Sequence, residues 1–244
     1  MDAIATIKKH QSVRKFTGES ISQEQLTQIE DAIIRTSSTC FFQLITTIEV
    51  SDKAKLQQIA ALSGHQEHIA ACSHFLFFCL DVTKLQHIEA MPKTLPFRVL
   101  FSGITDAGLY CQNALTAAES LGLGGVVISA FRVQIAKIAE LLELPQGCAP
   151  LVGLCLGVPD PKFLEGQKPR LPRSWLIMKE HYQDPFDAAE LKQYDEEMQR
   201  YYESRVYNQR SDNWTNSARN LGKDYAVKAP SLIAFFNAQG FIFE

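Results

Sequence analysis

The chain has 244 residues, of which 46% are hydrophobic and 21% are charged, and its formal net charge is −3. This composition is typical of a folded globular protein and excludes general disorder, which needs low hydrophobicity and high net charge. The small negative charge argues against a nucleic-acid-binding protein, since such domains are usually strongly basic. The apolar runs, such as residues 75–80, are far shorter than the roughly 20 residues of a membrane span. We therefore expect neither a nucleic acid nor a membrane as a partner.

The sequence contains six cysteines, and none of them forms a C-x-x-C pair. Most lie in apolar runs, as Cys79 and Cys155 do, which predicts buried free thiols in a reducing compartment. The N-terminal residues carry no apolar segment of the kind found in secretory signals, so we expect a cytoplasmic protein. His65 and His68 are too few ligands for a zinc site, and a solvated turn is the expected structure there.

Helices and strands alternate through the first part of the chain. Ser22 and Gln25 form a potential capping box, which predicts the start of a helix whose apolar residues continue to Ile34. Apolar and β-branched runs predict strands, of which the almost continuously apolar one is expected to be covered on both faces. The predicted elements are helices at residues 2–9, 22–34 and 54–62 and strands at residues 42–50 and 74–82.

A helix rich in alanine and glycine is expected at residues 103–121, either buried centrally or packed against a partner. Beyond it the pattern predicts strands at residues 126–128 and 151–156, helices at 135–142, 187–205 and 231–238, a loop at 160–173 and an aperiodic polar stretch at 212–224. The alternation indicates a mixed α and β fold, and no internal repeat is visible.

Several common catalytic motifs are absent. The sequence has no G-x-S-x-G elbow, no H-E-x-x-H helix and no P-loop. Gly122 and Gly124 begin like a dinucleotide fingerprint, but Val127 stands at the third glycine position. The segment also leads from a helix into a strand, which is the reverse of the Rossmann order, so a Rossmann NAD site is excluded.

Three groups of polar and basic residues stand beside predicted loops: His10, Ser12 and Arg14; Lys168 and Arg170; and Arg205 and Arg210. Alternate residues of an extended stretch point the same way, so the first group can present an imidazole, a hydroxyl and a guanidinium together. Such groups suit a phosphate or a polarised carbonyl. Taken singly, each group also fits a solvated loop or surface.

Taken in order, these segments resemble the flavin-dependent nitroreductase family, and within it the branch of oxygen-insensitive NADPH nitroreductases and NADPH–flavin oxidoreductases. Residues 10–17, HQSVRKFT, are similar to that branch's H-R-S-[IV]-R-x-F-T, and residues 118–126, AESLGLGGV, to its A-E-S-x-G-L-G-G-V. Residues 153–157, 168–172 and 193–214 match the later blocks, so the resemblance covers nearly the whole chain.

The resemblance implies an α+β fold in which helices wrap a central mixed, mainly antiparallel sheet. It implies one domain over residues 1–244, with a charged excursion at about 160–224 on the NADPH side. It further implies an intertwined homodimer with FMN at the subunit interface. The implied reaction uses NADPH to reduce nitroaromatics, quinones or free flavin by two-electron ping-pong hydride transfer.

The family's functional residues map onto positions of this sequence. The implied cofactor site comprises His10, Gln11, Ser12, Arg14, Gln66, Lys168 and Arg170, the backbone of Val127, Ile128 and Ser129, and Ser38 from the other subunit. His10 and Ser12 would address the phosphate and ribityl chain, and Arg14 the pyrimidine edge. Lys168 and Arg170 would bind the phosphate of FMN. Arg205 and Arg210 would receive the phosphates of NADPH, and no catalytic acid, base or metal is implied.

The sequence departs from the family pattern at Gln11, at residues 127–130 and at Cys40. The changed segment beside the flavin leaves open a specialised flavin enzyme that acts on one substrate. A second alternative is a flavin-free interaction protein that uses the charged helix at residues 187–205 as a docking surface.

Overall fold

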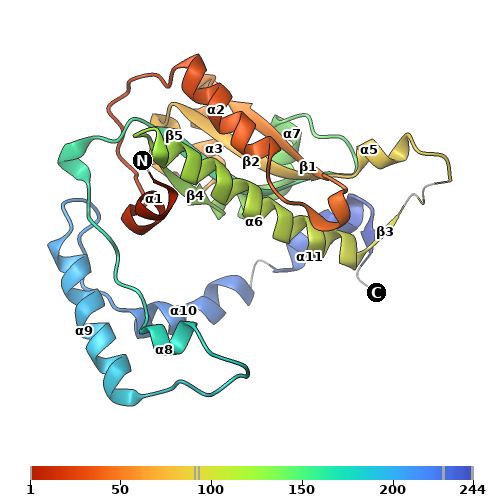
Figure 1. Cartoon of the computed structure of the whole chain (residues 1–244). Coiled ribbons are helices and arrows are strands. Elements are labelled where there is room, and N and C mark those ends of the chain that lie inside the picture. Colours follow the sequence, from red (N-terminus) through yellow and green to blue (C-terminus); the bar gives the residue numbers. More distant parts are fainter. Residues whose placement is uncertain (1, 91, 93, 227–228, 243–244) are drawn as a thin grey trace. The chain divides into compact units, whose positions relative to one another are not determined.

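The computed structural model describes residues 2–90, 92, 94–226 and 229–242 (Figure 1). The chain divides into two compact units, Met1–Asp160 with Ala229–Glu244, and Pro161–Lys228.

The first unit is built on a four-stranded sheet with the order β1-β2-β5-β4, in which every neighbouring pair is antiparallel. Its strands are β1 (Ile45–Val50), β2 (His74–Asp81), β4 (Gly124–Ile128) and β5 (Cys148–Gly157). A separate two-stranded sheet pairs β3 (Leu95–Pro96) with β6 (Phe241–Ile242) in parallel. The prediction of mixed, mainly antiparallel pairing is confirmed.

Helices cover both faces of the main sheet. The helices of the first unit are α1 (Ala3–Lys9), α2 (Gln23–Ile34), α3 (Lys53–Leu62), α4 (Glu67–Ala71), α5 (Thr83–Gln86), α6 (Phe97–Ser120), α7 (Ile135–Leu141) and α11 (Ala229–Ala238). The long helix α6 runs beside α2 in Figure 1, and both contribute to one apolar core.

The buried strand β2 divides the interior into two cores. Leu76, Phe78 and Leu80 belong to the cluster shared with α2 and α6, whereas Phe75 and Phe77 belong to the cluster shared with α3 and α4. Successive side chains of a strand point to opposite faces. The continuous apolar run therefore corresponds to a strand covered on both sides, as predicted.

The segment between α2 and β1 differs from the expectation. The capping box at the start of α2 is present, with Ser22 Oγ accepting from the Gln25 amide at 3.2 Å. The predicted strand at residues 42–50, however, begins only at Ile45. Phe41 and Gln43 have φ values of 59° and 53°, which are incompatible with an extended strand.

The second unit contains α8 (Arg173–Leu176), α9 (Ala188–Ser204) and α10 (Trp214–Ala226). Tyr194, Met198 and Tyr202 of α9 form its buried cluster. The prediction of an aperiodic stretch at residues 212–224 is wrong, because α10 occupies most of it. Its first turn is stabilised by Asp195, whose carboxylate accepts from the Thr215 amide at 3.0 Å, a tertiary contact that sequence periodicity does not reveal.

All six cysteines are free thiols, and five of them are buried, which confirms the prediction of unpaired cysteines. Burial raises the pKa of Cys111 to about 12, so this thiol stays protonated. Cys40 is the exposed one. Among the residues that the structure describes, none of the helices combines the length and the apolar composition that a membrane span requires.

Candidate functional site

The motif segment at residues 10–17 lies in an extended conformation along the edge of the sheet. The Val13 amide donates to the Gly125 carbonyl at 2.9 Å, and the Thr17 amide donates to the Val158 carbonyl at 3.0 Å. Val13 is buried. Because extended residues alternate in direction, Ser12 and Arg14 point away from the side on which Val13 packs.

Two glycines allow this close approach. A Cβ atom at Gly124 would lie 2.6 Å from Cγ2 of Val13, and a Cβ atom at Gly157 would lie 2.6 Å from Cδ1 of Phe16. Real Cβ atoms do not approach carbon atoms so closely, since the contact optimum is about 3.5–4.0 Å. The absence of a side chain at each glycine therefore allows the motif segment to pack directly against β4 and β5.

The strand under this segment presents the residues expected beside the flavin. Val127 is 49% exposed and Ile128 is 3% exposed, so the two point to opposite faces of β4. Ser129 follows at the end of the strand. The backbone of residues 127–129 therefore lies on or directly after β4, the same strand whose Gly125 carbonyl accepts from the motif segment.

His10 has a partner that sequence reasoning missed. Its Nδ1 atom lies 2.6 Å from Oε1 of Glu119, near the end of α6. This contact engages one ring nitrogen and leaves Nε2 as the nitrogen available to a ligand. The signal was present in the sequence, because Glu119 belongs to the A-E-S motif, but spacing alone did not connect it to a residue 109 positions away.

Arg14 lies in the electrostatic neighbourhood of His68. Burial, followed by the charges of Arg14 and Lys15, lowers the pKa of His68 to about 4. Nε2 of His68 is buried and has no hydrogen-bond partner. The expectation of a solvated turn is therefore wrong for His68, which is a neutral, half-buried imidazole two residues after Gln66, the N-cap of α4.

Ser38 belongs to a turn that is fixed onto α6. The buried carboxylate of Asp106 accepts from the Thr39 amide at 3.1 and 3.0 Å and from the Thr39 hydroxyl at 2.8 Å. Ser38 Oγ accepts from the Gln43 amide at 3.3 Å. The turn leaves Phe41 77% exposed, which is costly for a large aromatic side chain in water.

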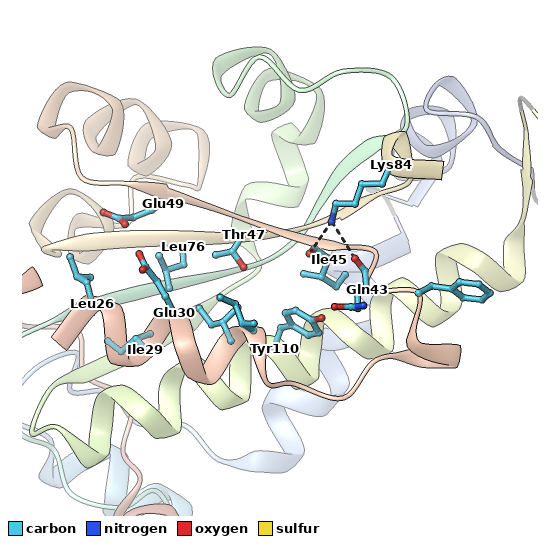
Figure 2. A pocket seen from close by; sticks show the side chains of 13 residues that line it. Leu26, Ile29, Glu30, Gln43, Ile45, Thr47, Glu49, Leu76, Lys84 and Tyr110 are labelled. Atoms are coloured by element: carbon cyan, nitrogen blue, oxygen red, sulfur yellow. Dashed lines mark hydrogen bonds between the residues drawn. The ribbon is translucent and has the colours of Figure 1, made fainter. Parts of the chain in front are cut away.

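A cavity of about 640 Å³ lies between α2, α6 and the edge strand β1 (Figure 2). Its lining is mainly apolar, and on one side Lys84 Nζ donates to the carbonyls of Gln43 at 3.2 Å and Ile45 at 3.5 Å. None of the expected cofactor residues lines it. The cavity and the motif segment are therefore two separate features of the first unit.

The second unit brings three expected basic residues around one aromatic ring. Measured to the centroid of the Tyr202 ring, Lys168 Nζ lies at 5.1 Å, Arg205 Cζ at 5.8 Å and Arg210 Cζ at 4.0 Å. Arg205 and Arg210 therefore lie close to the same tyrosine ring. Arg170 donates to the Lys168 carbonyl at 2.6 Å, which keeps its guanidinium beside the same loop.

Arg205 and Arg210 have acidic partners that the sequence did not indicate. Arg205 forms a two-point ion pair with Glu165, with Nε at 2.6 Å from Oε1 and Nη2 against Oε2. Arg210 Nε lies 3.2 Å from Oδ2 of Asp212. Only the first pair is buried, with side chains 7% and 8% exposed.

Comparison with known proteins identifies the family. The nitroreductase family model matches residues 7–158, and the model of the nitroreductase family C-terminal domain matches residues 168–244. The chain belongs to the nitroreductase family. This assignment confirms the resemblance drawn from the ordered motifs.

This member of the nitroreductase family has relatives that match nearly its whole length. It is 35% identical over 239 residues to an NADPH-flavin oxidoreductase of Vibrio harveyi, covering 98% of both chains. It is 38% identical over 237 residues to an oxygen-insensitive NADPH nitroreductase of Salmonella typhimurium, covering 95% of this chain and 94% of the relative.

Solved structures share the fold. A hypothetical oxidoreductase from Bacillus subtilis superposes on this chain with a TM-score of 0.90 at 33% identity, over 100% of both chains. The NADPH:FMN oxidoreductase from Vibrio harveyi, in complex with NAD+, gives a TM-score of 0.87 at 33% identity over 98% of both. The predicted α+β nitroreductase fold is therefore confirmed.

Proposed function

We propose that the protein is an FMN-dependent oxidoreductase that uses NADPH to reduce nitroaromatics, quinones or free flavin. The observation that carries this proposal is the motif segment held on β4, in which Ser12 and Arg14 flank the residue bonded to Gly125 at the start of that strand. The names of the relatives, an NADPH-flavin oxidoreductase and an oxygen-insensitive NADPH nitroreductase, support the same activity. An FMN reductase [NAD(P)H] of Bacillus subtilis, 36% identical over 224 residues, supports FMN as the flavin.

The residues of the first unit fit a flavin nucleotide in chemical type. Arg14 supplies a guanidinium, His10 a ring nitrogen not engaged by Glu119, and Ser12 and Gln11 a hydroxyl and an amide. The buried, unpartnered Nε2 of His68 near Arg14 is a further polar group that a bound ligand can satisfy. Bound FMN would supply the redox chemistry, accepting hydride from NADPH and delivering two electrons to an acceptor.

Each chain residue then has a binding or orienting role. Arg14 would place positive charge at the pyrimidine edge, where it favours the more negative reduced state. Lys168 and Arg170 would bind the phosphate of FMN, since cations on a proline-bearing loop suit a dianion. Gln66 and the backbone of residues 127–129 would hold the ring, together with Ser38 of a second copy.

NADPH would bind through the second unit. Arg205 and Arg210 stand with Lys168 around Tyr202, and such a cluster suits the phosphates of NADPH. NADPH and the acceptor are expected to bind in turn, which predicts parallel lines in double-reciprocal plots.

A homodimer is proposed on the exposed face of α6. Phe97, Phe101 and Ile104 are 40%, 62% and 47% exposed at helical spacing, and an apolar stripe of this kind is stabilised when a second copy covers it. Sedimentation velocity tests the proposal: a dimer is expected, and a monomer at micromolar concentration would contradict it. A cytoplasmic location remains a prediction from the free cysteines.

The proposed activity is tested by adding FMN to the purified apoprotein and following the quenching of flavin fluorescence. Stoichiometric quenching is expected, with weaker binding in Lys168→Ala and Arg170→Ala variants. The loaded protein is then supplied with NADPH and a panel of quinone, nitroaromatic and flavin acceptors. A protein that neither binds FMN nor oxidises NADPH with any acceptor would refute the proposal.

A further inference from the structure

The buried ion pair between Arg205 and Glu165 joins two segments of the second unit. Arg205 ends α9 as its C-cap residue, and Glu165 lies in the loop before the Lys-Pro-Arg motif. The carboxylate engages Nε at 2.6 Å and Nη2 in the two-point geometry that is strongest for a guanidinium. Both side chains are more than nine-tenths buried.

This arrangement bears directly on the proposed role of Arg205. A phosphate recognised by a guanidinium prefers the same two-point geometry that the carboxylate already occupies. With the Arg205 side chain only 7% exposed, a phosphate can reach it only if Glu165 withdraws. The backbone beside Glu165 suits such a change of direction, since Gly166 turns the loop at φ 74° with no atom near its Cβ position.

The ion pair between Arg210 and Asp212 is more exposed than the pair between Arg205 and Glu165. Arg210 and Asp212 are 47% and 24% exposed, so water and salt screen their attraction. Lys168 and Arg210 thus present charge to an incoming phosphate with little competition. The attraction between Glu165 and Arg205, by contrast, is little screened by water and salt, because both side chains are buried.

We propose that Glu165 determines how strongly the enzyme prefers NADPH over NADH, by competing with the 2′-phosphate for Arg205. The inference rests on the proposed function, in which Arg205 reads that phosphate. The carboxylate and the phosphate exclude each other at one guanidinium, so each weakens the binding of the other by the same factor. Removing the charge of Glu165 therefore strengthens binding of the nucleotide that carries the additional phosphate.

The test uses the FMN-loaded enzyme and the Glu165→Gln variant. Glutamine keeps one carbonyl oxygen that can accept from Arg205 but removes the charge, so the loop retains a contact. The inhibition constant of 2′,5′-ADP against NADPH is expected to fall about fivefold or more, whereas that of 5′-AMP stays unchanged. The ratio of kcat/KM for NADPH to that for NADH rises by the same factor.

Two controls separate the inference from the function on which it rests. Glu196→Gln removes one charge from the exposed surface of α9 and is expected to leave both constants unchanged. Arg205→Ala is expected to raise the KM for NADPH more than that for NADH. If Arg205→Ala affects both nucleotides equally, the proposed phosphate role of Arg205 fails.

Other outcomes overturn the inference alone. If Arg205→Ala acts selectively on NADPH but Glu165→Gln weakens binding of 2′,5′-ADP, Glu165 supports the arginine instead of competing with the ligand. An unchanged constant, or an equal gain for NADPH and NADH, also contradicts the inference. Retained flavin absorbance and an unfolding midpoint near that of the parent show that the Glu165→Gln variant is folded. Glu165→Asp, which shortens the side chain, serves as a second variant, and its gain in affinity for 2′,5′-ADP is expected to be intermediate.

Discussion

Gly124→Ala is expected to weaken FMN binding by displacing the motif segment from β4. The added methyl would lie 2.6 Å from Cγ2 and 2.9 Å from Cβ of Val13, and 2.9 Å from Cγ of Pro159. Each contact is shorter by roughly 0.6–1.4 Å than the carbon–carbon optimum of about 3.5–4.0 Å. The segment must therefore move outward, which also stretches the 2.9 Å bond from the Val13 amide to Gly125.

The size of the effect follows from two terms. Overpacking of this kind costs about 1–3 kcal/mol of unfolding free energy, which corresponds to a fall of about 2–4 °C in the melting midpoint per kcal/mol for a chain of this length. Loss of one charge-assisted contact from the displaced segment costs about 1.5–3 kcal/mol of binding. The Kd for FMN is therefore expected to rise roughly ten- to a hundredfold.

The assay is titration of apoprotein with FMN, followed by flavin fluorescence, beside thermal unfolding of the same samples. Gly103→Ala is the matched control, because its methyl would lie 2.7 Å from Cδ1 of Leu80 in the core beneath α6. That variant overpacks the protein without touching the motif segment and is expected to keep the parent FMN affinity. A folded Gly124→Ala protein with unchanged affinity would refute the positioning role of this segment.

Further predictions address the charged groups of the first unit. Arg14→Ala should lower the two-electron reduction potential of the bound flavin by roughly 30–65 mV, the equivalent of about 1.5–3 kcal/mol. Arg14→Lys, which keeps the positive charge, should have a potential close to that of the parent. Equal potentials in all three proteins would show that the charge of Arg14 does not affect the flavin. The pKa of His68 in the folded protein, about 4, lies below the ordinary histidine value of 6.5. The contribution of this group to stability is therefore complete above pH 6.5 and is lost as the pH falls toward 4. His68→Gln should flatten that part of the stability profile in denaturant titrations, and an unaltered slope would contradict the assignment. Asp106→Ala should cost about 1–3 kcal/mol, because the partly buried Thr39 amide loses its acceptor, and a melting midpoint equal to the parent's would show that Asp106 does not hold the turn.

Local signals in the sequence were sufficient for much of the fold. The Ser22–Gln25 capping box is a contact between residues three apart, so its pattern is readable without tertiary structure. The continuous apolar run of β2 likewise identifies a strand buried on both faces. The resemblance to the family then supplied the sheet type that periodicity alone left open.

The remaining features depend on contacts between distant residues. The pairs His10–Glu119 and Arg205–Glu165 join positions 109 and 40 residues apart, and no spacing rule connects them. The start of α10 depends on Asp195, which lies in another helix. The turn before β1 departs from an extended strand because Phe41 and Gln43 adopt positive φ values, which their residue types do not indicate.

The central claim is that this chain holds FMN and passes electrons from NADPH to an acceptor. Anaerobic titration of the FMN-loaded protein with NADPH tests it most directly. One equivalent of NADPH is expected to bleach the flavin absorbance, and a quinone added afterwards is expected to restore it. A flavin spectrum that does not change with excess NADPH would show that the protein does not pass electrons from NADPH to FMN.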